Sequence, residues 1–164
     1  MRKLILLQKG IITGLTMIAL SLFFFYSLKQ PPESSLQYII YIVYTIGIGW
    51  SILAFSGKST KAVTFRDYFS AGFRTFILVT LLMVVFTFAF YRLNPQILEA
   101  KITLNNELAI REGGHTPAEI ESNAKQMRSI FMPMMLMIKT FMYLFLGALL
   151  SAVISGTILQ MKKN

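Results

Sequence analysis

The chain has 164 residues, of which 55% are hydrophobic and only 14% are charged, whereas a soluble domain carries about 25% charged residues. This deficit is concentrated in long uncharged runs, which favour an integral membrane protein over a soluble domain. Despite the net charge of +9, no nucleic-acid partner is expected, because many lysines and arginines flank the apolar runs instead of forming one soluble basic face. The absence of cysteine removes disulfides and thiolate catalysis.

Four apolar segments are long enough to cross a bilayer, since a helix needs about 20 residues to span a ~30 Å hydrocarbon core. They are predicted at about residues 4–28, 36–55, 75–91 and 140–159. The first begins like a signal peptide, but its apolar run is too long and no small-residue cleavage site follows it, so we interpret it as a retained transmembrane helix. The predicted fold class is therefore all-α: an integral membrane four-helix bundle that forms a single membrane domain over residues 1–164.

The third span is preceded by the stretch TFRDYFSAGFRTF, residues 64–76, which predicts an amphipathic helix in the membrane plane over residues 64–74. Thr64 and Asp67 fit a capping box, in which an N-cap hydroxyl residue pairs with an acid three residues later. Phenylalanines recur on one face of this helix and charged residues on the other. Two interpretations stay open: the stretch is simply the basic end of a helix, or it docks a cytoplasmic partner or a lipid headgroup.

The charged face supplies the first interface candidates, Arg66, Asp67 and Arg74. Asp67 and Arg74 are seven residues apart in the sequence, so an ion pair between them across two helical turns is a hypothesis. Gly72 is either the bend between the in-plane and spanning parts or a point of close packing.

Small residues recur at four-residue spacing within the predicted spans. The first span contains Gly10 and Gly14, and the fourth contains Gly147, Ser151 and Ser155. Such ridges let helix backbones approach closely. These residues are interface candidates, either for packing among the four spans or for contact with another membrane subunit.

Residues 96–131 are too long and hydrophilic for a simple loop, and they predict a helical hairpin outside the bilayer, between the third and fourth spans. A Gly-Gly pair forms its turn. The second arm starts with Thr116 as N-cap and Glu119 three residues after it, which is a second capping box. His115, the sole histidine, is interpreted as a turn residue.

Little polar chemistry is visible inside the spans, which contain no aspartate or glutamate. Lys9 can extend its side chain to the membrane surface. Lys139 lies at the outer boundary if the fourth span is 140–159, and nearer the midplane if the helix is set deeper, where an ionisable group usually marks function. No nucleophile elbow, phosphate loop or metal-spaced set of acids is present, so no catalytic, cofactor-binding or metal-ligating residue is predicted.

The distribution of lysine and arginine predicts that both termini are cytoplasmic, because basic residues concentrate on the inner side of a membrane. With that orientation the inner side receives Arg2, Lys3, Lys58, Lys61, Arg66, Arg74, Lys162 and Lys163. The outer side receives Lys29 and the long hydrophilic segment, in which basic and acidic residues balance.

Several of these features together resemble the domain-of-unknown-function 4199 family, small four-span membrane proteins of Bacteroidota. The resemblance is carried by Phe65, Phe69, Gly72-Phe73, Asn94-Pro95, the turn GGHTPAEIE and the ending LQMKK. It covers nearly the whole chain and implies the fold and a bacterial inner-membrane location, but no activity and no functional residues. Proteins of this family are often encoded beside a polyprenyl-phosphate glycosyltransferase-like protein, which implies a role in envelope synthesis.

The sequence thus favours a non-catalytic accessory or scaffold subunit of a membrane or envelope-synthesis complex. Its expected partners are membrane lipids and either a membrane protein, such as the polyprenyl-phosphate glycosyltransferase-like protein, or a second copy of the chain. A small-solute or lipid carrier is the alternative. An enzyme is the least favoured class, because no set of acid, base and nucleophile is visible.

Overall fold

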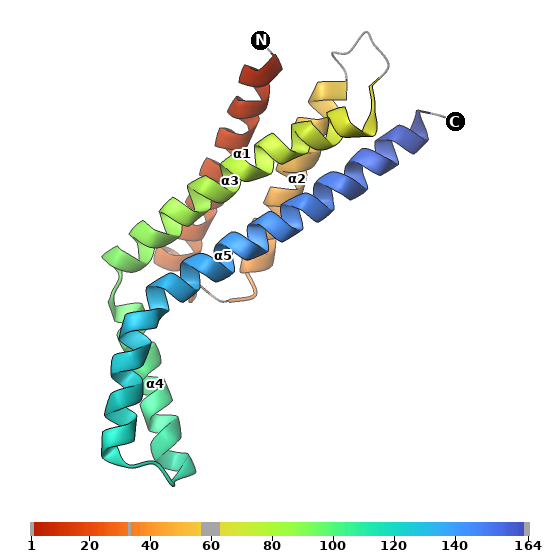
Figure 1. Ribbon diagram of the computed structural model, residues 1–164. Coiled ribbons are helices and arrows are strands. Elements are labelled where there is room, and N and C mark those ends of the chain that lie inside the picture. The colour runs from red at the N-terminus through yellow and green to blue at the C-terminus, as the bar shows by residue number, and fades with distance from the viewer. Residues whose placement is uncertain (1, 33, 57–62, 163–164) are drawn as a thin grey trace. The chain divides into compact units, whose positions relative to one another are not determined.

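The computed structural model describes residues 2–32, 34–56 and 63–162. Within these residues it contains five helices and no strand, in agreement with the predicted all-α class. The helices are α1 (Arg2–Tyr26), α2 (Gln37–Ser56), α3 (Phe65–Leu93), α4 (Gln96–Glu112) and α5 (Pro117–Met161), as Figure 1 shows.

The chain forms two compact units. The larger unit comprises residues 1–83 and 140–164, and the smaller unit comprises residues 84–139. Both α3 and α5 therefore contribute to each unit, and the predicted single membrane domain corresponds to two units in the structure.

Four helices have the length and composition needed to cross a membrane. They lie at Leu6–Tyr26, Gln37–Phe55, Phe65–Leu93 and Pro117–Met161, and they contain the four spans predicted from the sequence, apart from the outermost residues of the first two. The remaining helix, α4, has 17 residues and carries charged side chains from its first turn to its last, so neither its length nor its composition suits a span.

The larger unit is held together by close contacts between its helices. At one end of this unit lie the start of α1, the end of α2, the start of α3 and the end of α5 (Figure 1). In its core Tyr44 of α2 is fully buried, and its hydroxyl donates a hydrogen bond of 2.8 Å to the carbonyl oxygen of Tyr143 on α5. A buried hydroxyl needs such a partner, because leaving it unpaired in an apolar interior is costly.

The first part of α3 continues directly into the span that follows it. The helix runs without interruption from Phe65 to Leu93, and Gly72 within it is a point of close packing, where an added Cβ atom would meet Ser151 and Ile52. The predicted in-plane helix over 64–74 is thus the beginning of α3 itself. Its buried residues include Tyr68 and Ala71, whereas Phe65 and Phe73 of the phenylalanine face are exposed.

The smaller unit contains α4 and the first part of α5, with a turn between them. Gly113 and Gly114 have φ angles of 70° and 84°, which glycine adopts without the strain that a side chain would add. The predicted capping box of α5 is confirmed, because the Thr116 N–H donates to Glu119 over 2.7 Å and the Glu119 N–H donates to the Thr116 hydroxyl over 3.3 Å. The rings of Tyr91 and Phe131 pack edge to face, 5.2 Å apart.

Candidate functional site

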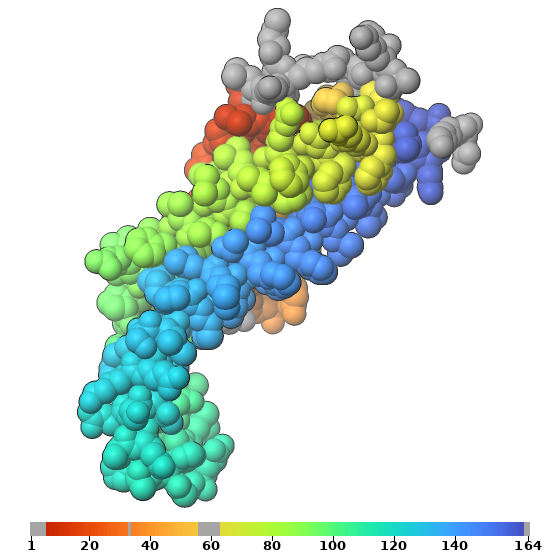
Figure 2. Space-filling view, in the orientation of Figure 1, coloured from red at the N-terminus to blue at the C-terminus, as the bar shows by residue number. Residues whose placement is uncertain are grey.

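An open groove runs along the surface of the larger unit between α1 and α3. The two helices lie side by side in Figure 2, α1 in red and α3 in yellow to green. Arg74 lies among apolar side chains in the groove, which are those of Leu6, Leu7, Phe73, Ile77, Leu78 and Leu81. A single cation in an otherwise apolar groove is an arrangement that suits an amphiphile.

Two glycines of α1 allow α3 to approach closely beside the groove. A Cβ atom added at Gly10 would lie 3.0 Å from Cδ2 of Leu78, and one added at Gly14 would lie 2.7 Å from Cδ1 of Leu82. The side chains of Leu78 and Leu82 therefore pack against the glycine backbone, and the exposed side chains of Leu7 and Leu81 line the groove.

The charged residues at the start of α3 occupy separate environments. The Asp67 carboxylate accepts hydrogen bonds from the Thr64 N–H at 3.0 Å and the Thr64 hydroxyl at 2.7 Å. The acid half of the predicted capping box is thus formed, and the hypothesis of an Asp67–Arg74 ion pair is wrong. Among the described residues Arg74 has no ion pair. Arg66 is exposed in the first turn of α3 and does not line the groove.

A buried lysine lies on the opposite side of α1. Lys9 is only 9% exposed, and its ammonium lies 3.7 Å from the ring centroid of Trp50 on α2, a cation–π contact. The expectation that Lys9 simply extends to the membrane surface missed this partner. Lys9 lies near the start of the first predicted span and Trp50 near the end of the second. Because consecutive spans run antiparallel, the two residues were expected at a similar depth in the membrane, and this could have indicated their contact.

Buried hydroxyl groups line the contacts among α2, α3 and α5. The hydroxyls of Ser51 and Thr75 lie 2.6 Å apart, and a Cβ atom added at Gly72 would lie 2.5 Å from Oγ of Ser151. Ser151 and Ser155 are fully buried, and their hydroxyls have no hydrogen-bond partner within the described parts of the chain. Their small size is what these positions require, because a larger side chain would separate the helices.

The small-residue candidates are therefore used inside the larger unit. Gly10 and Gly14 contact α3, and Gly147 of α5 contacts Tyr44 and Phe76. Ser151 faces Gly72. Of the two alternatives open for these residues, packing among the spans is the one that the structure shows for them.

Lys139, the candidate intramembrane charge, is half-buried within α5 and belongs to the smaller unit. Arg74 and the small-residue candidates belong to the larger unit.

A second pocket lies in the smaller unit. It is lined by His115 together with Asn106, Ile110, Pro117, Ile120, Glu121, Ala124 and Arg128. Its charged groups are already paired, Glu121 with Lys125 at 2.9 Å and Arg128 with Glu99 at 2.8 Å. In the part of the chain that the structure describes, no group of three or more histidine, cysteine or acidic side chains could hold a metal ion.

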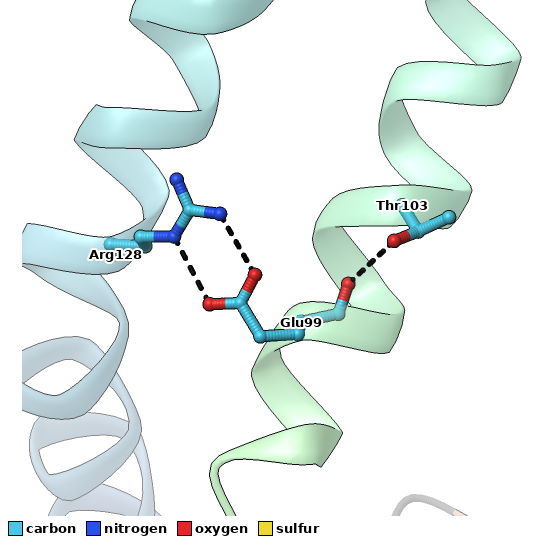
Figure 3. A network of polar contacts seen from close by, with 3 residues as sticks. All are labelled: Glu99, Thr103 and Arg128. Atoms are coloured by element: carbon cyan, nitrogen blue, oxygen red, sulfur yellow. Dashed lines mark hydrogen bonds and ion pairs between the residues drawn. The ribbon is translucent and has the colours of Figure 1, made fainter.

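The ion pair between Glu99 of α4 and Arg128 of α5 joins the two helices of the smaller unit (Figure 3). The guanidinium donates two hydrogen bonds to the carboxylate, from Nε at 3.0 Å and from an Nη atom at 2.8 Å. This bidentate geometry is stronger than a single contact, although both side chains are about half exposed and solvent therefore screens the pair.

We expect the Glu99–Arg128 pair to give the smaller unit a dependence on acid pH. The hydrogen bonds from Arg128 hold the pKa of the Glu99 carboxyl below its usual range of about 4.3. Because the folded-state pKa is lower than the unfolded-state pKa, the stabilisation is present above the unfolded-state value and is lost as pH falls through the folded-state value. A ¹³C NMR titration of the glutamate side-chain carbonyls, with Glu99 assigned by Glu99→Gln, should show this lowered midpoint. Arg128→Gln should move the midpoint upward, and an unchanged midpoint would contradict the pairing.

These features define the class of the protein. Four helices with the length and composition of membrane spans, packed through glycine and serine contacts and carrying a surface groove, belong to a small multi-pass α-helical membrane protein.

The chain belongs to the family described as "Protein of unknown function (DUF4199)", which it matches over residues 8–159. The resemblance seen in the sequence is thereby confirmed. No curated protein and no solved structure matches the chain. The family description assigns no activity, so a functional proposal depends on the surfaces and contacts described above.

Proposed function

We propose that the protein is a non-catalytic accessory or scaffold subunit of a membrane or envelope-synthesis complex in the bacterial inner membrane. The proposed orientation has both termini in the cytoplasm and places α4 with the first part of α5 as a helical hairpin on the outer side. The proposed partner is another membrane protein, such as a polyprenyl-phosphate glycosyltransferase-like protein.

The observation that carries this proposal is an exposed apolar stripe on α4. Leu104 and Leu108 are four residues apart on one helix face and are 58% and 47% exposed. They lie opposite Ile102, which is buried in the smaller unit. Because neither the length nor the composition of α4 suits a membrane span, we propose that this stripe contacts the partner protein and not lipid tails.

The interior of the larger unit supports a scaffold over a carrier of small solutes. A solute path requires a polar cavity between the spans. Here Gly147 touches Tyr44 and Phe76, and Gly72 touches Ser151, so these helices meet directly. A lipid carrier is the second candidate, favoured by the groove between α1 and α3, which opens to the surface and not to the interior.

The test is affinity purification from native membranes in mild detergent, followed by mass spectrometry. Tagged wild-type protein should retain a membrane protein in stoichiometric amount. The double variant Leu104→Ser, Leu108→Ser should lose it, because the apolar contact area is removed. Asn105→Ala changes an exposed residue between them and should keep the partner. Recovery of only a monomer or a homo-oligomer of the wild-type chain would count against the scaffold role.

A further inference from the structure

We propose that the groove between α1 and α3 binds one molecule of an anionic phospholipid, with an acyl chain along the groove and the phosphate on the Arg74 guanidinium. This inference depends on α1 and α3 being membrane spans and does not depend on the scaffold role. Failure to find a protein partner would therefore leave it untouched.

The apolar part of the groove suits a hydrocarbon chain. Below Arg74, toward the middle of α3, its wall consists of Ile77, Leu78 and Leu81, and the seven helical steps from Arg74 to Leu81 cover about 10 Å. Leu7 forms the facing wall on α1 and is 54% exposed. A flexible acyl chain can lie along such an elongated, open groove, whereas a compact polar ligand would leave the apolar side chains of the groove without apolar contacts.

Arg74 supplies the recognition of the phosphate. Its guanidinium presents five N–H donors in a planar fork that matches phosphate oxygens. Asp67, the nearest acid in the sequence, is occupied by its hydrogen bonds to Thr64. An arginine among apolar side chains at the edge of a span is costly without a counter-charge, and a bound anion offsets that cost.

The charge of the chain favours an anionic over a zwitterionic lipid. The protein carries a net charge of +9, and two further exposed cations lie at the start of α3: Arg66 in its first turn, and Lys162, whose ammonium lies 5.6 Å from the ring centroid of Tyr68. Each basic residue near an anionic membrane surface contributes favourably to its attraction. The guanidinium of Arg74 and the apolar side chains of the groove together favour a lipid over free phosphate, because free phosphate would contact only the guanidinium.

The test uses the full chain in nanodiscs with equal amounts of phosphatidylglycerol and phosphatidylcholine, with native mass spectrometry counting the lipids that stay bound. Wild-type protein should retain phosphatidylglycerol preferentially. Arg74→Gln should reduce that retention about fivefold, the effect of one basic charge at a membrane surface. Arg111→Gln removes an exposed arginine of α4 outside the groove and should have no effect. Arg74→Lys keeps the charge and should retain most of the lipid.

The groove itself is tested by filling it. Leu81→Trp places a bulky ring in the groove and should also reduce retention of phosphatidylglycerol. The control is Leu15→Trp, which changes a similarly exposed residue of α1 outside the groove and should leave the retention unchanged. Far-UV circular dichroism checks that each variant keeps its helices, and Ile77→Phe is a milder obstruction that replaces Leu81→Trp if the latter does not fold. Equal retention by Arg74→Gln and Arg111→Gln would overturn the proposal. So would displacement of the lipid by millimolar inorganic phosphate, or full retention by a folded variant with an obstructed groove.

Discussion

Replacing Gly147 by alanine is expected to destabilise the larger unit by about 1–3 kcal/mol, the usual cost of overpacking a filled core. A Cβ atom at this position would lie 2.5 Å from Cγ and 2.7 Å from Cβ of Phe76, and it would also meet the Tyr44 hydroxyl. Phe76 and Tyr44 are both buried, so neither ring can move without disturbing further contacts. The free energy of unfolding, measured by titration with SDS and followed by far-UV circular dichroism, reports this change.

The matched control is Gly156→Ala in the same helix. No heavy atom of the described residues lies within 4 Å of the position that its Cβ would take. Since alanine is the better helix former, this variant should be as stable as the wild type or slightly more stable. Equal effects of the two substitutions would contradict the packing of α5 against α2 and α3.

Single-cysteine labelling is expected to give an all-or-none result for the proposed orientation. The chain has no cysteine, so each variant carries one thiol. His115→Cys, in the exposed turn between α4 and α5, should react with a membrane-impermeant maleimide in intact spheroplasts. Lys162→Cys, exposed at the end of α5, should react only after the membrane is permeabilised, because the basic ends of the spans face the cytoplasm.

Ser35→Cys provides the internal control for this experiment. Ser35 is exposed in the connection between α1 and α2, which four spans with cytoplasmic termini place on the same side as His115. It should therefore label together with His115→Cys. Labelling of His115→Cys and Lys162→Cys in the same compartment would rule out this orientation.

The two proposed binding surfaces lie in different units: the groove for the lipid in the larger unit, and the α4 stripe for the protein partner in the smaller unit. The groove of the larger unit lies beside the predicted spans, where an anionic lipid is available. The stripe at Leu104 and Leu108 lies in the smaller unit, on a helix that is not a span. The lipid and partner experiments can therefore succeed or fail independently.

Several elements of this protein could be predicted from its sequence alone, because they depend on interactions between residues that are close in the sequence. The four apolar spans follow from length and composition, because a helix of about 20 apolar residues satisfies its own backbone in lipid. The two helix starts at Thr64 and Thr116 follow from hydrogen bonds that join residues only three positions apart. Such short-range interactions depend little on how the helices are arranged.

Only the tertiary structure decided which faces and which partners are used. On α3 the pattern of phenylalanines did not show which residues meet the other helices: Phe65 and Phe73 are exposed while Phe76 is buried, and the helices approach most closely at small residues such as Gly72. The spacing of Gly10 and Gly14 predicted a close contact but not that α3 makes it. The groove around Arg74 likewise combines residues of α3 with Leu6 and Leu7 of α1, which lie more than 60 residues earlier in the sequence, and no local pattern specifies that meeting.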